Sequence, residues 1–188
     1  MTRIAAVSGS RSADSTTRAA LRVALRAAAD AGAETDLIDL GAVDLPLYHP
    51  DEDAQGDSEA LKRRVREADG VLAGTPVYRG SYSSTFKNFH DFCGSDEYAN
   101  TAVGLLATAG GGSYGGTLEH LRSTFRNVHA WTVPHEVGIQ GASSKIETSG
   151  ATDAATPDGE PRITDEDLRR RTERLGRVVL EHAERMRE

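Results

Sequence analysis

Residues 69–91, D-G-V-L-A-G-T-P-V-Y-R-G-S-Y-S-S-T-F-K-N-F-H-D, decide the fold of this 188-residue chain. Residues 71–73 form a short apolar run typical of a strand buried on both faces, and Thr75 and Pro76 end it because proline has no N–H for a sheet ladder. From about Ser83 the apolar residues recur with helical spacing. The stretch therefore predicts a strand, a loop and a helix, with polar groups at the carboxyl end of the strand, where open α/β sheets bind ligands.

The loop in this stretch carries side chains suited to a flat ligand. Tyr78 offers an aromatic ring and Gly80 allows close approach of the backbone. An ordinary strand-to-helix turn is the alternative, and we favour the ligand loop. Its candidate binding residues are Pro76, Val77, Tyr78, Arg79, Gly80 and Ser81.

A second candidate loop follows an expected first strand at residues 3–7. It has the sequence S-G-S-R-S-A-D-S-T-T over 8–17 and leads into a helical pattern of alanines that stops at Gly32. Free N–H groups and the helix dipole favour an anion at such a helix start, so the loop predicts a phosphate site. The alternative is that Ser15 simply caps the helix. The candidate ligands are Ser10, Arg11, Ser15, Thr16 and Thr17.

A third candidate loop follows an expected strand at residues 101–107. Its sequence, T-A-G-G-G-S-Y-G-G over 108–116, is rich in glycine, which suits a backbone that must approach a flat ligand. A flexible surface loop is the alternative. The candidate binding residues are Thr108, Ala109, Gly110 and Gly111.

The remaining pattern predicts a second strand at 34–40, a helix capped by Ser58, and a fifth strand at 131–139 that Pro134 places near an edge or bulge. Residues 140–161 lack apolar periodicity, so a mobile loop is expected over about 140–162. Thr164 and Asp167 resemble a capping signal for a last helix at 164–187. Strands alternating with helices predict one doubly wound α/β domain over residues 1–188, with a five-stranded parallel sheet in the order 2-1-3-4-5 and helices on both faces.

Composition excludes several classes of function. The net charge of −7 argues against nucleic acid, which needs a concentrated basic patch. The single cysteine, Cys93, excludes an internal disulfide framework and C-x-x-C motifs, and we expect it to be a packed small hydrophobe. No apolar run is long enough for a membrane span, so the expectation is a soluble, cytoplasmic protein. Because the six histidines are scattered, no metal-ligand cluster is predicted, and no residue is nominated as a general acid or base.

The three loops together resemble those of the NAD(P)H-dependent FMN reductase family, flavodoxin-like flavoproteins that include quinone, azo-dye and chromate reductases. The resemblance rests on three groups of residues: Gly9-Ser10 with Ser15, the segment Pro76-Val77-Tyr78-Arg79-Gly80-Ser81 with Phe86-Lys87-Asn88, and the glycines of 108–116. Arg11 stands one place before the arginine position of the family, and Arg79 stands where the family most often has asparagine.

This resemblance implies a specific role for each loop. The first would hold the phosphate of FMN, the second would lie along its ring with support from Phe86-Lys87-Asn88, and the third would border the nicotinamide site. It further implies NAD(P)H as co-substrate, a small-molecule electron acceptor such as a flavin or quinone, and a homodimer or homotetramer. Two alternatives are a flavodoxin-like electron carrier that does not use NAD(P)H, and a non-enzymatic module that binds a phospho-ligand.

Overall fold

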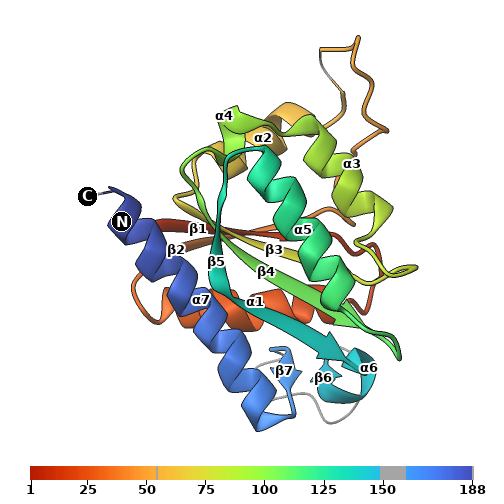
Figure 1. The fold of residues 1–188 in the computed structure, drawn as a ribbon, viewed down its shortest axis with the longest axis vertical. Helices are drawn as coiled ribbons and strands as arrows, with labels where there is room; N and C mark the ends of the chain where they lie inside the picture. Colours follow the sequence, from red (N-terminus) through yellow and green to blue (C-terminus); the bar gives the residue numbers. More distant parts are fainter. Residues whose placement is uncertain (54, 149–159, 188) are drawn as a thin grey trace.

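The computed structural model describes residues 1–53, 55–148 and 160–187, and places a parallel five-stranded sheet between two layers of helices (Figure 1). The sheet order is β2-β1-β3-β4-β5, which confirms the predicted order 2-1-3-4-5 and the flavodoxin-like α/β class. Its strands are β1 Arg3–Ser8, β2 Glu34–Asp39, β3 Gly70–Pro76, β4 Ala102–Ala109 and β5 Trp131–Gln140. Every residue of β3 and β4 is buried, as continuous apolar runs in a covered parallel sheet require.

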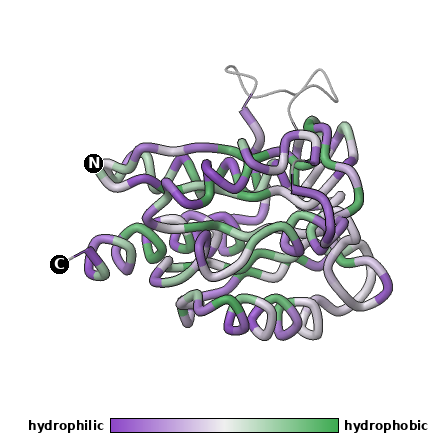
Figure 2. The backbone as a smooth tube through the Cα atoms, turned by 90° about the horizontal axis from the view of Figure 1, so that it is seen from above, coloured by the Kyte–Doolittle hydropathy of each residue, from purple (hydrophilic) through white to green (hydrophobic). Residues whose placement is uncertain are grey.

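The helices divide between the two faces of the sheet. One core cluster packs α1 and α7 against the sheet, and the other packs α2, α3 and α5 against the opposite face. Hydrophobic and hydrophilic positions alternate along these helices (Figure 2), as expected when one side of each helix is buried. The helices are α1 Thr16–Ala29, α2 Ser58–Arg66, α3 Ser84–Phe92, α4 Ser95–Tyr98, α5 Gly115–Asn127, α6 Ala142–Lys145 and α7 Glu166–Arg187.

Helices α1 and α7 approach closely at one glycine. A Cβ atom on Gly176, in the middle of α7, would overlap the backbone carbonyl of Ala24 on α1. Glycine lowers the helix propensity at this position, but its lack of a Cβ lets the two backbones pack closely.

The ends of the chain lie side by side, beyond the amino ends of the strands (Figure 1). The Arg187 guanidinium donates to the carbonyl of Met1 at 3.4 Å and to the Thr2 hydroxyl at 3.3 Å. The first strand and the last helix are thus joined at one end of the molecule.

Three local expectations were wrong. Ser58 is the first residue of α2 rather than its cap, which is Asp57, and Asp165 rather than Thr164 caps α7 by accepting the Leu168 N–H at 3.0 Å. Part of the loop expected over 140–162 is regular, because it contains α6 and the strand Ile146–Glu147 (β6), which pairs antiparallel with Arg162–Ile163 (β7). Residues 149–159 of that expected loop lie outside the described residues.

The expectation for Pro134 is confirmed. Strand β5 is the edge strand of the sheet, and its register on β4 shifts between Val103, paired with Thr132, and Leu105, paired with Glu136. Pro134 lies inside this irregular stretch, where its missing N–H costs no ladder bond.

Candidate functional site

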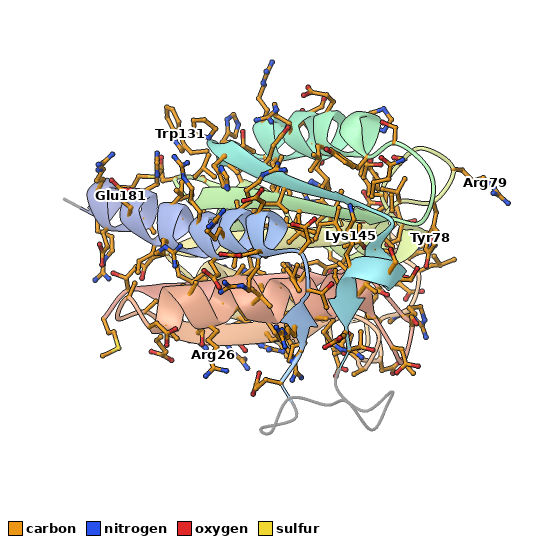
Figure 3. The ribbon with its side chains drawn as sticks, turned by 90° about the horizontal axis from the view of Figure 1, so that it is seen from below. Arg26, Tyr78, Arg79, Trp131, Lys145 and Glu181 are labelled. Carbon is orange, nitrogen blue, oxygen red and sulfur yellow. The ribbon has the colours of Figure 1, made fainter. Side chains whose placement is uncertain are left out.

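The three candidate loops meet at the carboxyl ends of the strands. Loop 1 (residues 9–15) joins β1 to α1, loop 2 (77–83) joins β3 to α3, and loop 3 (110–114) joins β4 to α5. Strands β1, β3 and β4 are neighbours, and the pairing of Pro76 with Thr108 shows that β3 and β4 end level. Tyr78 and Arg79 lie at this end of the sheet, and Trp131 lies at the other (Figure 3).

Buried hydrogen bonds fasten loop 1 to β3 and α3. The Gly9 N–H donates to the Gly74 carbonyl at 2.8 Å, and the Ser83 hydroxyl donates to the Gly9 carbonyl at 2.6 Å. The Ser83 N–H in turn donates to the Thr75 hydroxyl at 2.9 Å. A Cβ on Gly9 would stand only 2.7 Å from the Cβ of Phe86, so glycine is required for this close approach.

Thr108 connects all three loops. Its carbonyl accepts the Val77 N–H at 2.8 Å, and its hydroxyl lies 2.6 Å from the Thr17 hydroxyl at the start of α1. Both hydroxyls are buried. The Thr17 side chain therefore ties the start of α1, next to loop 1, to the end of β4, next to loop 3.

Loop 1 presents polar groups around the start of α1. Ser15 caps the helix by accepting the Arg18 N–H at 3.0 Å, and the Ser10 hydroxyl accepts the Ser12 N–H at 3.3 Å. Both serines are buried, whereas the Arg11 side chain is exposed.

Sequence reasoning missed Arg18, which supports loop 1 from the outside. Its guanidinium donates to the Asp39 carboxylate at 3.0 Å, to the Ser12 carbonyl at 3.4 Å and to the Ala13 carbonyl. The contact with Asp39 spans 21 positions, so no local motif reveals it. The one available signal was an acidic residue at the carboxyl end of the second strand.

Loop 2 contains a tight turn. Tyr78 and Ser81 exchange two backbone hydrogen bonds, of 2.9 and 3.1 Å, around Arg79 and Gly80. These central residues have positive φ angles of 53° and 81°, which favour asparagine and glycine. The turn leaves the Tyr78 side chain 58% exposed and directs Arg79 away from the molecule (Figure 3).

Sequence reasoning also missed His120 on α5, because the six histidines are scattered along the sequence without a motif. Its Nδ1 lies 2.9 Å from the Ser81 hydroxyl, and its ring lies edge-on to Tyr82 with the centroids 6.3 Å apart. His120 thereby connects the turn of loop 2 to the helix that follows loop 3.

Loop 3 is anchored through its carbonyl groups. The Gly110 carbonyl accepts the Gly141 N–H at 2.6 Å, and the Gly111 carbonyl accepts the Gln140 side-chain amide at 3.0 Å. Within the described part of the chain, the N–H groups of residues 110–112 have no acceptor. Loop 3 therefore offers free backbone donors where the sequence predicted bare backbone.

Comparison with known proteins identifies the family. Residues 2–144 match the family model described as NADPH-dependent FMN reductase. The chain belongs to this family. An NADPH azoreductase of Bacillus sp. is 38% identical over 112 residues, which cover 57% of this chain and 62% of the relative. An FMN-dependent NADPH-azoreductase of Staphylococcus saprophyticus is 33% identical over 94 residues, which cover 50% of each protein. The chain thus spans between half and two thirds of the length of these curated relatives.

Solved structures show the same fold at lower identity. The flavoenzyme NAD(P)H:(acceptor) oxidoreductase FerB from Paracoccus denitrificans has a TM-score of 0.74 and 23% identity, over 98% of both chains. The apo form of an NADH:FMN oxidoreductase has a TM-score of 0.69 and 20% identity, over 94% of this chain and 89% of that one. Both share the flavodoxin-like arrangement of the FMN reductase family.

The residues present fit the cofactor for which this family is named. Within the described residues, the N–H groups of Ser10, Arg11 and Thr17 have no acceptor, and that of Thr16 belongs to the first turn of α1, which has no intrahelical acceptor. A phosphate placed here would accept from these donors at the positive end of the helix dipole. A Cβ on Gly116, just after loop 3, would lie 3.5 Å from the Gly80 carbonyl of loop 2. The three loops thus offer free backbone donors for an anion and the exposed aromatic ring of Tyr78.

One supporting role implied by the resemblance differs in this structure. Asn88 accepts the Tyr48 N–H at 2.9 Å and donates to the Pro46 carbonyl at 2.8 Å. Its side chain therefore fixes the loop after β2 and forms no described bond to loop 2.

Two groups with a perturbed pKa, His90 and Cys93, lie on α3 or directly after it and are packed in the core. Burial raises the pKa of the Cys93 thiol far above its usual range, so this cysteine is a packed side chain and not a nucleophile. Burial also lowers the pKa of His90, which lies among Phe86, Tyr98 and Phe125.

In the described ranges, no group of histidine, cysteine and acidic residues has a metal-binding arrangement. None of the described helices is both long and apolar enough to cross a bilayer.

Proposed function

We propose that this protein binds FMN at the three loops, accepts reducing equivalents from NAD(P)H and passes them to a small acceptor such as a flavin, a quinone or an azo dye. The observation that carries the proposal is the cross-linking of loops 1, 2 and 3 at one end of the sheet, with free N–H donors in loops 1 and 3. Membership of the FMN reductase family and the names of the azoreductase relatives support it.

In this proposal loop 1 holds the phosphate. The Ser10 hydroxyl and the amides of Thr16 and Thr17 donate to it, and Arg11 approaches from the solvent side. Arg18 does not reach the ligand and instead holds the loop carbonyls in place through its contact with Asp39. The cradle is therefore formed before the ligand arrives, which reduces the entropy cost of binding.

Loops 2 and 3 position the ring. When bound, FMN supplies the two-electron chemistry between nicotinamide and acceptor. The turn at Tyr78 would hold the ring, and the free amides of Gly110 and Gly111 would stabilise negative charge on the bound cofactor. The exposed Tyr78 leaves room for a planar substrate to stack. In this proposal the transfer between nicotinamide, flavin and acceptor needs no acid or base of the protein.

The proposal is tested by an absorption spectrum of the purified protein with FMN, followed by anaerobic stopped-flow mixing with NADPH and NADH. We expect bound flavin, bleaching by at least one nucleotide, and reoxidation by a quinone or azo dye. Bound flavin that neither nucleotide bleaches would instead support the electron carrier. A protein that takes up no FMN would contradict the proposal, and the non-enzymatic module that binds a phospho-ligand would then be the remaining alternative.

A variant of loop 1 tests the placement of the phosphate. Ser10→Ala removes one hydrogen bond to a charged group, so the dissociation constant of FMN should rise about tenfold or more. Ser95→Ala on α4, an exposed serine outside the site, is the matched control and should leave the constant unchanged. Equal affinities in a fluorescence titration of the two variants would remove Ser10 from the site.

The assembly and location remain proposals. The resemblance implies a homodimer or homotetramer, and light scattering coupled to size-exclusion chromatography measures which one forms. The cytoplasmic location stays a prediction from sequence, for which fractionation of the host cell is the test.

A further inference from the structure

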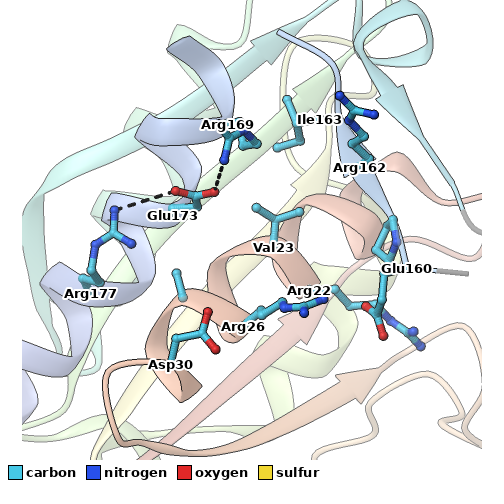
Figure 4. A pocket seen from close by; sticks show the side chains of 12 residues that line it. Arg22, Val23, Arg26, Asp30, Glu160, Arg162, Ile163, Arg169, Glu173 and Arg177 are labelled. Carbon is cyan, nitrogen blue, oxygen red and sulfur yellow. Dashed lines mark hydrogen bonds and ion pairs between the residues drawn. The ribbon is translucent and has the colours of Figure 1, made fainter. Parts of the chain in front are cut away.

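A cavity with a volume of about 260 Å³ lies between α1, β7 and α7 (Figure 4). Five of its lining residues are arginines from all three elements and three are acidic: Arg22, Arg26, Arg162, Arg169, Arg177, Asp30, Glu160 and Glu173. The formal charge of these side chains is +2, five minus three, in a protein whose net charge is −7. Positive charge is thus concentrated here against the overall balance of the molecule.

Only part of this positive charge is neutralised by ion pairs. Arg169 and Arg177 share the Glu173 carboxylate, at 2.9 and 3.9 Å. Within the described residues, no ion pair joins Arg22, Arg26 or Arg162 to a carboxylate. Three guanidinium groups from two different elements therefore line one cavity without an acidic partner.

The arrangement on α1 is unfavourable for the helix itself. Arg18, Arg22 and Arg26 follow one another at intervals of four residues, and like charges at this spacing repel along a helix face. Arg18 is compensated by Asp39, whereas Arg22 and Arg26 are not compensated within the described residues. A bound anion would supply the missing negative charge.

The size and shape of the cavity limit the class of ligand. Its volume lies near the lower end for small-molecule sites, and it is a hollow between helices rather than an extended basic face. Arginines that approach from several sides match the bidentate geometry of phosphate oxygens. Arg26 lies nine residues beyond Thr17, roughly 13 Å along α1, whereas Arg22 also lines a smaller pocket that Ser15 of loop 1 borders.

We propose that this cavity binds a small anion that carries a diphosphate group, held by Arg22 and Arg26 of α1 and Arg162 of β7. The arginines bound to Glu173 form its far wall. The proposal does not depend on the proposed function, because none of these residues belongs to loops 1, 2 or 3.

Isothermal titration of FMN-saturated protein with inorganic pyrophosphate tests the proposal, since FMN then occupies the loop 1 site. The double variant Arg22→Gln/Arg26→Gln should lower the association constant about tenfold or more, because two charge-assisted contacts are lost. Arg171→Gln/Arg174→Gln removes two exposed arginines of α7 that do not line the cavity, and should change the constant less than about twofold.

A parallel titration with ADP distinguishes the source of the diphosphate. Tighter binding of ADP assigns an organic diphosphate, equal binding assigns recognition of the diphosphate alone, and both outcomes support the site if the first double variant weakens them. Absence of binding by both probes, or equal affinity in the two double variants, would overturn the proposal. If the protein takes up no FMN, the same titrations are made on the protein alone. A lower association constant in Arg22→Gln/Arg26→Gln than in Arg171→Gln/Arg174→Gln would then still support the cavity.

Discussion

Arg79 holds a backbone conformation that suits a different residue. Its φ of 53° lies in the left-handed region, where a side chain with a Cβ is strained and asparagine is tolerated better. Arg79→Asn should therefore raise the free energy of unfolding by about 0.5–1 kcal/mol, as measured by urea denaturation. Arg174→Asn, in the regular helix α7, should lower it by a few tenths of a kcal/mol. A loss of stability in both variants would show that Arg79 makes a compensating contact.

His90 makes the stability of the protein depend on pH. Burial lowers its pKa below the usual value of 6.5, so the unfolded chain takes up a proton at a higher pH than the folded chain. The free energy of unfolding should fall as the pH drops below about 6.5, because the folded protein must then keep a neutral imidazole. His90→Phe should flatten the plot of melting temperature against pH between 8 and 5.5 relative to the wild-type protein. Parallel curves for wild type and His90→Phe would contradict this account.

At the scale of elements, the contact between α1 and α7 depends on Gly176. Gly176→Ala improves helix propensity but forces a methyl group into the Ala24 carbonyl, so we expect a net loss of about 1–3 kcal/mol in denaturant unfolding. Gly94→Ala is the control, because a Cβ there meets open space. A more stable Gly176→Ala protein would mean that the helices can move apart without cost.

The elements also show what local sequence can predict. The irregularity at Pro134 was predicted, and the Ser15 cap was the stated alternative to a phosphate ligand, because each depends on one residue and its immediate neighbours. The pairing of β6 with β7 was not, because Ile146 and Ile163 meet across 17 positions without apolar periodicity between them. The caps of α2 and α7 were each assigned one residue away, since aspartate and a hydroxyl residue stand side by side there.

At the scale of the whole molecule, the strand order followed from the alternation of strands and helices, and the convergence of the loops followed from that order. The bonds that hold the loops together could not be predicted in this way. The Ser83 contact with Gly9 spans 74 positions and the Thr17 contact with Thr108 spans 91. The sequence therefore indicated the location of the candidate site, whereas Arg18, Ser83 and His120 emerged only from the fold.

FMN should stabilise the folded protein as a whole. At a concentration 100 times its dissociation constant, a ligand of the native state adds about 2.7 kcal/mol, or roughly 5–10 °C in melting temperature for a chain of this size. Riboflavin, which lacks the phosphate, should shift the melting temperature much less because it cannot use loop 1. Equal shifts in a thermal scan would mean that the phosphate is not held there.

The neighbouring termini have a practical consequence. Because Arg187 bonds to Met1 and Thr2 at the end of the molecule opposite the three loops, an anchor at either terminus would leave those loops turned outward. The protein should thus tolerate immobilisation on an electrode through one end. The same proximity would let a short linker join the two ends, and new ends could then be opened at a surface turn to give a circular permutant.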